Sequence, residues 1–527
     1  MHSDSSGVAS KIVDARQTGR DEFDLAILGT GFHGVSIARE ASRLGLKVVL
    51  LHDQTIIDSP CAPYHAVLGA DIGKLESLNF TQVIANQQAL LELHTQSPHL
   101  IHTIPVFISH NGAIRSARRV KFGIRAYRSL QKKGRKTGLA SSQPDKLSAD
   151  RLIGLNQENV FPEHVNEFTV HAKRLLIKTA QEAIAMGVED RPYHFVKQGV
   201  RSEKNWQLTV IDKQQGDEKY LYAKALVNCA SSAIDSVLQD ILKVKTRCQS
   251  KVIQCAWLYI NKPQQWPFGL MLQLNNKTLP YVFSASKNTL CVGPIIVESD
   301  QPMEKQLAIN NVLEELNNTT AFNTTVDDIV RCEWHTESIF DDINGRISDA
   351  YNEAYLDLNN AKGLAPVLSI FGTNIAQSNK VARESLTILQ TYFPQLKDLR
   401  HNTPTCQTPT LLSKDLTHLS ELEIQHFLWD KYPLLNEKNV MRMYHTYGTA
   451  IQELLAGLEG CTDIEAMGEH FGHGLYAREV DYLVQHEWVN SVEDILWRNT
   501  YFGLVLDARQ RQALTDYLAK CQSHMSI

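Results

Sequence analysis

Three glycines near the start of the chain have the spacing of a phosphate-binding turn. Gly29, Gly31 and Gly34 form a GxGxxG pattern within the stretch GTGFHG. Glycine at these positions allows a tight turn, close approach of the backbone to a pyrophosphate, and close packing of a helix on a strand. The free N–H groups at the start of the following helix then point at the phosphates. The chemistry that this turn predicts is the binding of a dinucleotide.

The flanking residues predict the elements that must position such a turn. Residues 25–28 form a short apolar run, residues 35–43 carry apolar side chains at helical spacing, and residues 47–51 form a second apolar run. A GxGxxG pattern alone is a weak signal, but inside a strand, helix and strand it is typical of a nucleotide-binding fold. We expect the rest of the chain to be organised around residues 24–53.

Two later groups of alternating apolar and polar residues predict antiparallel sheets. The first spans residues 193–228 and the second residues 252–293. The strand and turn pattern returns at residues 367–371, which are followed by Gly372. We therefore expect both antiparallel groups to form a substrate domain inserted between the halves of the nucleotide-binding fold. From about residue 401 onward the spacing of apolar residues is almost entirely helical.

Composition limits the classes of partner. The chain has 527 residues, 43% of them apolar and 21% charged, and a formal net charge of -5, so overall charge does not indicate a nucleic-acid partner. Its 9 cysteines are scattered without a CxxC pair, which is typical of a reducing compartment. Residues 1–22 are polar and lack the apolar core of a signal peptide, and no apolar run is long enough to span a bilayer. We expect a cytoplasmic protein.

One segment is strongly basic. Residues 112–138 hold ten Lys or Arg residues and no acidic residue, with apolar side chains interleaved among the charges. A helix of this kind can bind an anionic lipid surface. The same pattern also fits a solvated helix followed by a charged loop.

Motifs for other chemistries are incomplete or absent. His486 and Glu487 resemble the start of a zinc-binding HExxH helix, but Asn490 occupies the position of the second histidine. The sequence contains no GxSxG and no GxxxxGK[ST] pattern. We therefore predict no metal site, no serine-hydrolase site and no P-loop, and the spacing alone assigns no catalytic residue.

Five stretches resemble the aerobic, FAD-dependent glycerol-3-phosphate dehydrogenase family, in order along the chain. They are LAILGTGFHGVSIAREASRLGLKVVLL from residue 25, SPHLIHTIPVFISHN from residue 97, LVNCA from residue 226, APVLSIFG from residue 365, and FGHGLYAREVDYLVQHEWVNSVEDILWRNT from residue 471. The last is long and specific to the helical domain of that family. The resemblance extends from about residue 24 to residue 518.

The resemblance implies an α/β fold (α+β overall): a Rossmann-like FAD-binding fold, an inserted antiparallel-sheet substrate domain and an all-helical C-terminal domain. The implied division is a flexible tail at residues 1–22, an FAD-dependent oxidoreductase domain at 23–400 and the helical domain at 401–527. FAD is the expected cofactor. The residues expected to bind it are Gly29, Gly31, Gly34 and Gly372.

The implied reaction is hydride transfer from C2 of sn-glycerol 3-phosphate to flavin N5, which gives dihydroxyacetone phosphate and passes electrons to a quinone. This chemistry needs cations around the phosphate dianion and a base or hydrogen-bond donor at the C2 hydroxyl, because the flavin accepts only the hydride. The resemblance also implies a small-molecule substrate, a homodimer, and peripheral attachment to the inner face of the cytoplasmic membrane through residues 112–138.

Several positions depart from the family pattern. His52, followed by Asp53, stands where the family has the glutamate that binds the ribose hydroxyls. Trp257 replaces an active-site histidine, Glu337 replaces a phosphate-binding arginine, and a second arginine corresponds to a position near Asn352. Replacing a phosphate-binding arginine by a glutamate places like charge against a dianion.

These departures leave three functions open. The protein is a glycerol-3-phosphate dehydrogenase, a flavoenzyme with a different substrate that is uncharged or cationic, or a catalytically degenerate paralogue that keeps the fold as a flavin-binding or scaffold protein. The presence of flavin in the purified protein separates the first two from a degenerate protein that has lost its cofactor.

Overall fold

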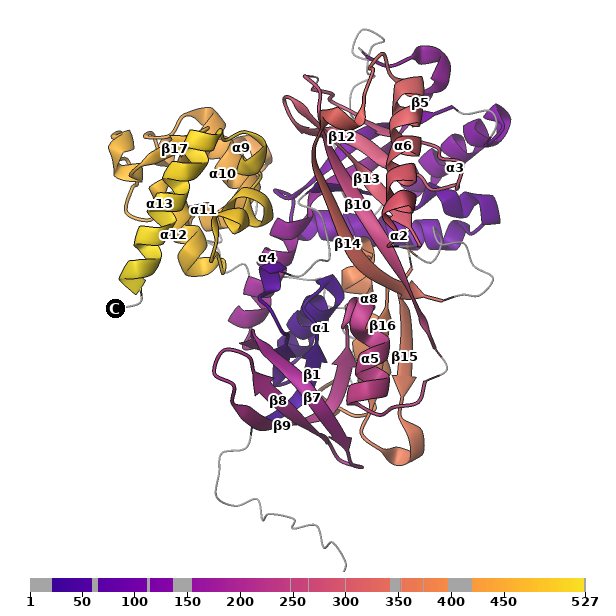
Figure 1. Ribbon diagram of the computed structural model, residues 1–527, viewed down its shortest axis with the longest axis vertical. Helices are drawn as coiled ribbons and strands as arrows, with labels where there is room; N and C mark the ends of the chain where they lie inside the picture. Colours follow the sequence, from indigo (N-terminus) through magenta and orange to yellow (C-terminus); the bar gives the residue numbers. More distant parts are fainter. Residues whose placement is uncertain are drawn as a thin grey trace, which may run out of the picture.

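The computed structural model describes residues 21–58, 65–110, 114–135, 154–246, 248–263, 265–298, 300–341, 351, 353–372, 374–396 and 419–525. Figure 1 shows three parts: a lower part built on β1 and β9, an upper part built on β10 and β13, and a separate helical part formed by the C-terminal residues. The first strand begins at Asp21. Residues 1–20 and 401–418 lie outside the described residues.

The lower part is a sheet with a parallel centre, in the order β15-β16-β9-β1-β2-β6. These strands are β15 (Tyr355–Asn359), β16 (Val367–Phe371), β9 (Glu218–Asn228), β1 (Asp21–Leu28), β2 (Val48–Leu51) and β6 (Glu189–Arg191). Leu25, Ala26 and Ile27 of β1 are fully buried, as expected for a strand covered on both faces. One face is covered by α1 (Phe32–Arg43), which packs between α4 (Ala172–Ala185) and α8 (Ser378–Leu389).

The first antiparallel group belongs to this lower sheet, so its predicted place in the substrate domain is wrong. It consists of β7 (His194–Arg201), β8 (Trp206–Asp212) and β9. The reason is the length of β9, whose residues 218–223 pair with β8 and residues 226–228 with β16, while residues 221–228 pair with β1. Trp206 of β8 is fully buried and anchors the meander on the face of the sheet opposite α1.

The upper part is the predicted substrate domain, an eight-stranded sheet in the order β14-β10-β13-β12-β11-β4-β5-β3. Its strands are β3 (His65–Leu68), β4 (Ile101–Ser109), β5 (Val160–His171), β10 (Ser250–Asn261), β11 (Gly269–Met271), β12 (Tyr281–Ser286), β13 (Thr289–Val297) and β14 (Ile329–Phe340). All neighbours are antiparallel except β4 and β11, which are parallel. Two separate stretches of the chain therefore build one sheet.

Three helices cover the upper sheet. They are α2 (Phe80–Gln96), α3 (Ala117–Arg135) and α6 (Pro302–Thr319). The basic helix α3 packs on α2 and β5, while α6 packs on β13. Ile124 and Tyr127 of α3 point into the core and are buried, so the interleaved apolar residues mainly serve packing.

The C-terminal part is helical, as predicted, with one small addition. It contains α9 (Glu421–Lys431), α10 (Glu437–Tyr447), α11 (Ile451–Leu454), α12 (Ala477–His486) and α13 (Ala508–Met525) around one apolar core. A short ladder of β17 (His470–Gly472) and β18 (Leu475–Tyr476) interrupts the helices. No helix of the described residues is long and apolar enough to cross a membrane.

Candidate functional site

The glycine turn between β1 and α1 is packed too closely for any side chain. Gly29 has φ +104, and a Cβ on it would lie 2.4 Å from the carbonyl oxygen of Cys229 at the end of β9. A Cβ on Gly34 would lie 2.3 Å from the carbonyl oxygen of Gly29. Gly31 is the N-cap residue of α1, and its carbonyl accepts a hydrogen bond from the N–H of Val35. The turn therefore has the form that a bound pyrophosphate requires.

A cavity of about 630 Å³ opens over this turn. The glycines predicted to bind the cofactor, Gly29, Gly31, Gly34 and Gly372, all line it. Gly372 follows β16 with φ +97, and a Cβ there would lie 2.4 Å from the carbonyl oxygen of Glu353. The structure thus brings together four glycines that lie up to 343 positions apart in the numbering of the chain (372 − 29). A cavity of this size falls within the usual range of about 300–1,000 Å³ for small-molecule sites.

His52 occupies the end of β2, where the cavity would meet a ribose. Its Nε2 lies 2.7 Å from Oδ1 of Asp190, while its Nδ1 is buried without a hydrogen-bond partner among the described residues. A carboxylate beside Nε2 favours the tautomer with the proton on Nε2, which leaves Nδ1 as an acceptor. His52 can therefore accept a hydrogen bond from a ribose hydroxyl. Asp53 is turned outward and pairs with Lys213 at 3.2 Å.

His33, inside the glycine turn, also lines this cavity. Burial lowers the pKa of His33 to about 4, so its ring is neutral at physiological pH. Neither ring nitrogen has a hydrogen-bond partner among the described residues. A neutral ring next to the turn adds no positive charge, so the backbone N–H groups of α1 are the main source of attraction for a pyrophosphate here.

A second, smaller cavity of about 140 Å³ lies against the upper sheet, and residues 374–376, which follow β16, close its other side. Its apolar wall includes Ala66 and Val67 of β3, Trp257 of β10 and Ile375. Trp257 is buried and its ring lies against Gly293, where a Cβ would be only 2.6 Å away. The tryptophan noted in the sequence therefore fills space in this cavity.

Glu337 is the one residue of β14 that lines both cavities. Its side chain is buried, with a relative exposure of 4%, and Oε1 lies 2.7 Å from Nε2 of His335. Glu337, which the resemblance aligns with a family arginine, thus lies at the junction of the two cavities. Asn352, the second position of this kind, lies outside the described residues.

The charges around the second cavity do not favour an anion. Its lining holds three acidic side chains and two basic ones among the described residues. They are Asp71, Glu76, Glu337, Arg115 and Lys277. Arg115 forms an ion pair with Glu76 and donates a second hydrogen bond to Gln273 at 3.3 Å. One of the two basic side chains, Arg115, is therefore committed to protein partners.

A buried polar cluster behind this cavity has no signal in the sequence. The Tyr127 hydroxyl donates to Oε1 of Glu167 at 2.9 Å, and the backbone N–H of Ala70 donates to the same hydroxyl at 2.8 Å. Burial raises the pKa of Glu167 to about 8, so this carboxyl group is mainly protonated at neutral pH. α3, β5 and the segment after β3 are thereby tied together at the wall of the cavity.

Replacing Glu167 with glutamine should remove a pH dependence of stability. Between its unfolded pKa of 4.5 and its folded pKa of about 8, Glu167 takes up a proton on folding, so its contribution to stability falls as pH rises. The free energy of unfolding of the wild type, relative to Glu167→Gln, should fall by about 1.4 kcal/mol per pH unit across this window. Urea unfolding at pH 5, 6, 7 and 8 measures this difference.

The matched control is the exposed Glu158, in the turn just before β5. Glu158→Gln should follow the wild type at every pH. If the wild type and Glu167→Gln show parallel stability curves, Glu167 is ionised in the folded protein and the account of this cluster is wrong.

Comparison with known proteins gives the same fold. A family model described as FAD dependent oxidoreductase matches residues 24–342. The X-ray structure of the glycerol-3-phosphate dehydrogenase from Bacillus halodurans complexed with FAD superposes with a TM-score of 0.66 and 16% identity, covering 95% of this chain and 91% of that one. This likeness confirms the predicted fold class, including the C-terminal part.

Relatives of similar length are dehydrogenases of polyol phosphates. The glycerol-3-phosphate dehydrogenase of Pseudomonas aeruginosa is 27% identical over 513 residues, or 95% of this chain and 96% of that protein. The D-erythritol 1-phosphate dehydrogenase of Brucella abortus is 24% identical over 513 residues, or 94% of this chain and 97% of that protein. The family match, the described glycine turn and the likeness along almost the whole length agree, and the chain belongs to the FAD dependent oxidoreductase family.

Proposed function

We propose that this protein binds FAD in the larger cavity and oxidises a small uncharged or cationic substrate, rather than glycerol 3-phosphate, in the smaller one. The observation that carries this proposal is Glu337, a buried acid at the junction of the two cavities. A carboxylate there repels a phosphate dianion, and a like charge at a buried contact costs several kcal/mol. The same carboxylate attracts an ammonium group or accepts a hydrogen bond from a hydroxyl.

The residues around the glycine turn fit FAD. Gly29, Gly31 and Gly34 would hold the pyrophosphate against the first turn of α1, and Nδ1 of His52 would accept a ribose hydroxyl. FAD, when bound, supplies the hydride acceptor. These assignments support the cofactor that the family match already indicates.

The residues of β14 then supply the proton chemistry. Oxidation of an alcohol or amine releases a proton from the O–H or N–H group when the hydride leaves the neighbouring carbon. Glu337 is placed to accept that proton, and its Oε1 lies 2.7 Å from Nε2 of His335. Trp257 lines the smaller cavity together with Glu337 and adds an apolar wall to it.

Relatives with different substrates support a change of specificity within this fold. Two of them are named for glycerol 3-phosphate and D-erythritol 1-phosphate, and both match this chain at no more than 27% identity. The family fold therefore accommodates substrates of different length. In this chain the change affects charge as well, because the described lining of the smaller cavity holds more acidic than basic side chains.

A catalytically degenerate flavoprotein is the second candidate. The observation that favours it is the small volume of the second cavity, about 140 Å³, which Trp257 lines. Small-molecule sites usually enclose about 300–1,000 Å³. On this reading the protein holds FAD but presents no room for a substrate beside it.

An anaerobic substrate panel separates these functions. The purified protein is mixed with glycerol 3-phosphate, with uncharged polyols and with amino alcohols, and bleaching of the flavin absorbance is followed in each case. We expect bleaching by a member of the uncharged or cationic sets, and slower bleaching by the same compound in Glu337→Gln. Bleaching by glycerol 3-phosphate alone would overturn the proposal. Flavin bands that only dithionite bleaches would favour the degenerate protein.

The acceptor and the assembly follow from the resemblance and stay predictions. We propose a quinone as the electron acceptor and a homodimer as the functional unit, as the family resemblance implies. Association with a membrane has more support than the acceptor or the dimer, because the basic side chains of α3 are exposed on the surface. Its exposed basic residues are Arg118, Arg119, Lys121, Arg125, Arg128 and Lys132.

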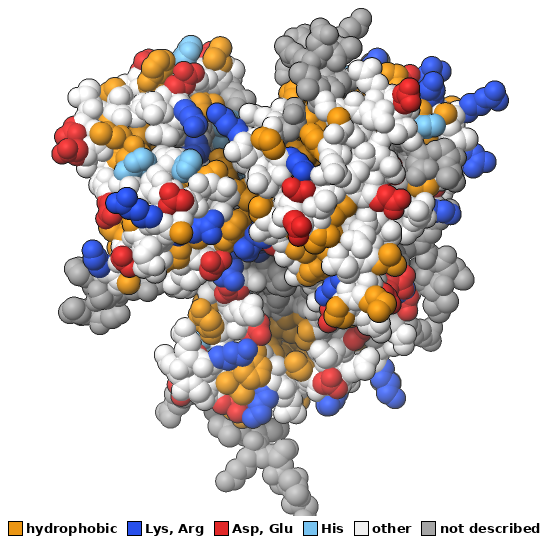
Figure 2. Space-filling model, turned by 45° about the horizontal axis from the view of Figure 1, so that its top comes forward, with side chains coloured by type: hydrophobic (Ala, Val, Ile, Leu, Met, Phe, Trp, Pro, Cys, Tyr) orange, Lys and Arg blue, Asp and Glu red, His pale blue; other side chains and the backbone are white. Residues whose placement is uncertain are grey.

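Binding to anionic vesicles should weaken greatly when four exposed basic residues of α3 are neutralised together. They are Arg118, Arg119, Lys121 and Arg125. Figure 2 shows Lys and Arg side chains along the edge of the molecule where α3 lies, and Phe122 beside them is 65% exposed. Each basic residue near an anionic surface contributes about 1 kcal/mol, so loss of four corresponds to roughly 10³-fold weaker binding at low salt. Co-sedimentation with phosphatidylserine vesicles measures this change.

The matched control neutralises four exposed lysines away from α3, namely Lys197, Lys204, Lys219 and Lys287. This variant removes the same total charge and should bind vesicles almost as well as the wild type. Equal loss in both variants would show a general charge effect, and no loss in the α3 variant would assign the helix to packing alone.

A further inference from the structure

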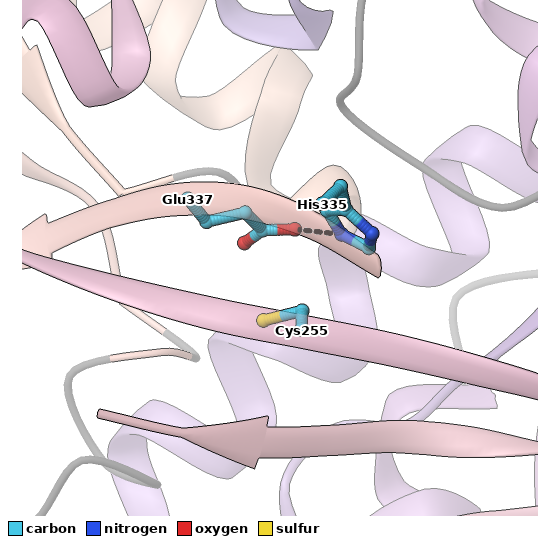
Figure 3. A group of neighbouring side chains, drawn as sticks. All are labelled: Cys255, His335 and Glu337. Carbon is cyan, nitrogen blue, oxygen red and sulfur yellow. Dashed lines mark hydrogen bonds and ion pairs between the residues drawn. The ribbon is translucent and has the colours of Figure 1, made fainter. Parts of the chain in front are cut away.

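Three side chains with metal-binding atoms meet on adjacent strands of the upper sheet. Cys255 lies on β10, and His335 and Glu337 lie on β14. One ligand atom from each lies within 4.8 Å of the others. Figure 3 shows Cys255 on its strand beside the other two, with the hydrogen bond between His335 and Glu337 drawn as a dashed line.

The register of the two strands explains this meeting. Cys255 is directly opposite His335 in the antiparallel ladder, and Glu337 follows His335 by two residues. Because side chains alternate along a strand, all three project from the same face. Cys255 and Glu337 are buried and His335 is nearly so, with a side-chain exposure of 10%. The three groups are therefore held on rigid elements, away from bulk water.

We propose that Cys255, His335 and Glu337 bind a divalent transition-metal ion, with Zn²⁺ as the ion that suits them best. A thiolate, an imidazole and a carboxylate are the ligands that zinc takes in proteins, and three protein ligands leave a fourth position open for water or a substrate oxygen. Mg²⁺ and Ca²⁺ prefer oxygen ligands alone, so the sulfur and nitrogen donors disfavour them. This proposal replaces the prediction from sequence that the chain has no metal site.

Metal binding requires a small rearrangement and the release of a proton. Nε2 of His335 and Oε1 of Glu337 are 2.7 Å apart, whereas zinc bonds of about 2.0–2.1 Å place tetrahedral ligands about 3.3 Å apart. The thiol proton of Cys255 leaves to solvent, and the imidazole proton moves to Nδ1 so that Nε2 can bind the metal. The carboxylate of Glu337 gives up its hydrogen bond to His335 and gains a metal bond.

The cluster lies beside both cavities, where a bound metal ion could act on a substrate. Glu337 lines both of them, so the ion would lie next to the junction. One thiolate and one carboxylate balance the charge of Zn²⁺, which leaves the site neutral overall. The open position could then polarise a hydroxyl or carbonyl oxygen of the substrate. With Zn²⁺ bound, Glu337 would be a metal ligand rather than the free carboxylate of the proposed oxidation, so the two proposals give this side chain different roles. They are tested separately, because metal content is measured without any substrate.

The test is metal analysis of the full-length protein prepared without a histidine tag. After dialysis against Zn²⁺ and then against metal-free buffer, we expect about one equivalent of zinc in the wild type. Cys255→Ser, His335→Asn and Glu337→Gln should each retain far less. The control is Cys291→Ser, which removes another buried cysteine of the same sheet that lies outside the cluster.

A second measurement on the wild type guards against variants that fail to fold. Replacement of Zn²⁺ by Co²⁺ should produce a thiolate-to-cobalt charge-transfer absorption, which Cys291→Ser keeps and which a difference spectrum separates from the flavin bands. Wild-type protein that holds no zinc, cobalt-loaded protein without this absorption, or zinc retained equally by all three cluster variants would overturn the proposal. Flavin reduction followed in the presence of a chelator tests the proposed function separately.

Discussion

Alanine in place of Gly29 should strongly weaken FAD binding. The new Cβ would lie 2.4 Å from the carbonyl oxygen and 2.8 Å from the carbonyl carbon of Cys229, and Gly29 has φ +104, which alanine rarely adopts. Because both obstacles are backbone, β1 and β9 must separate at the pyrophosphate site. We expect FAD binding to weaken by more than about tenfold, which corresponds to at least ~1.4 kcal/mol. Flavin released by heat from equal amounts of protein measures the loss.

The matched control is Gly45→Ala, at the turn after α1. Gly45 also has a positive φ, +85, but a Cβ there meets nothing within 4 Å. This variant carries the same kind of backbone strain without the clash, so it should keep its flavin. Gly34→Ala, whose Cβ would lie 2.3 Å from the carbonyl oxygen of Gly29, should behave like Gly29→Ala. Full flavin content in a folded Gly29→Ala protein would contradict the assignment of this turn.

Alanine in place of Arg174 should cost about 3–5 kcal/mol of stability, the usual effect of leaving one partner of a buried ion pair alone. Arg174 of α4 donates from Nη2 to Oε1 of Glu487 at 2.8 Å, and its Nη1 also contacts that carboxylate. Its Nε donates to the carbonyl oxygen of Thr446 at 3.0 Å, and Asn499 donates to Glu487 at 3.1 Å. This network joins the nucleotide-binding part to the C-terminal helices.

Denaturant unfolding and limited proteolysis measure the effect of Arg174→Ala. The C-terminal helices should become susceptible to protease at lower denaturant concentration than in the wild type. The double variant Arg174→Met with Glu487→Leu removes both charges and should lose less stability than Arg174→Ala alone.

The matched control for this ion pair is Arg383→Ala. Arg383 pairs with Glu92, but its side chain is 47% exposed, so its loss should cost less than about 1 kcal/mol. A similar small cost for Arg174→Ala would show that the contact between the two parts does not depend on this network.

The local elements of the fold were predictable because each depends on neighbouring residues. The glycine turn, α1 and β2 follow one another within residues 24–53, and the structure contains all three. The C-terminal helices likewise show their spacing of apolar residues directly. Glu487, which follows His486 in the incomplete zinc motif, accepts a hydrogen bond from Arg174.

The pairing of distant strands could not be predicted in the same way. The meander of β7, β8 and β9 reads as antiparallel in the sequence, but nothing local shows that β9 continues into the parallel sheet beside β1. The substrate domain draws strands from two stretches of the chain, and β4 and β11 pair across 160 residues or more. Placement of a strand in one sheet or another is decided by packing of remote residues.

Some site residues likewise have a local signal in the sequence, whereas others are brought together only by the fold. Gly29, Gly31 and Gly34 carry a local signal, and the resemblance was needed to add Gly372 and to draw attention to Glu337. Tyr127 and Glu167 have no such signal, because one is a helical aromatic residue and the other lies in a strand, and only the fold brings their oxygens to 2.9 Å. Cys255 and His335 are neighbours only through the register of β10 and β14.

The structure also changes the interpretation of His52. In the sequence it replaces a glutamate that binds ribose, which suggests a loss. In the structure Asp190 lies 2.7 Å from Nε2, and Nδ1 is buried without a partner among the described residues. The carboxylate of Asp190 beside Nε2 therefore leaves Nδ1 of His52 as the atom that would accept a ribose hydroxyl in the proposed cofactor site.

The central claim is that the cofactor site is kept while the phosphate site is not. The most direct measurement is the visible spectrum of the purified protein under anaerobic conditions, recorded first alone, then with glycerol 3-phosphate, and finally with dithionite. Our account predicts flavin bands that glycerol 3-phosphate leaves unchanged and dithionite bleaches. Absence of flavin bands, or their bleaching by glycerol 3-phosphate, would contradict it.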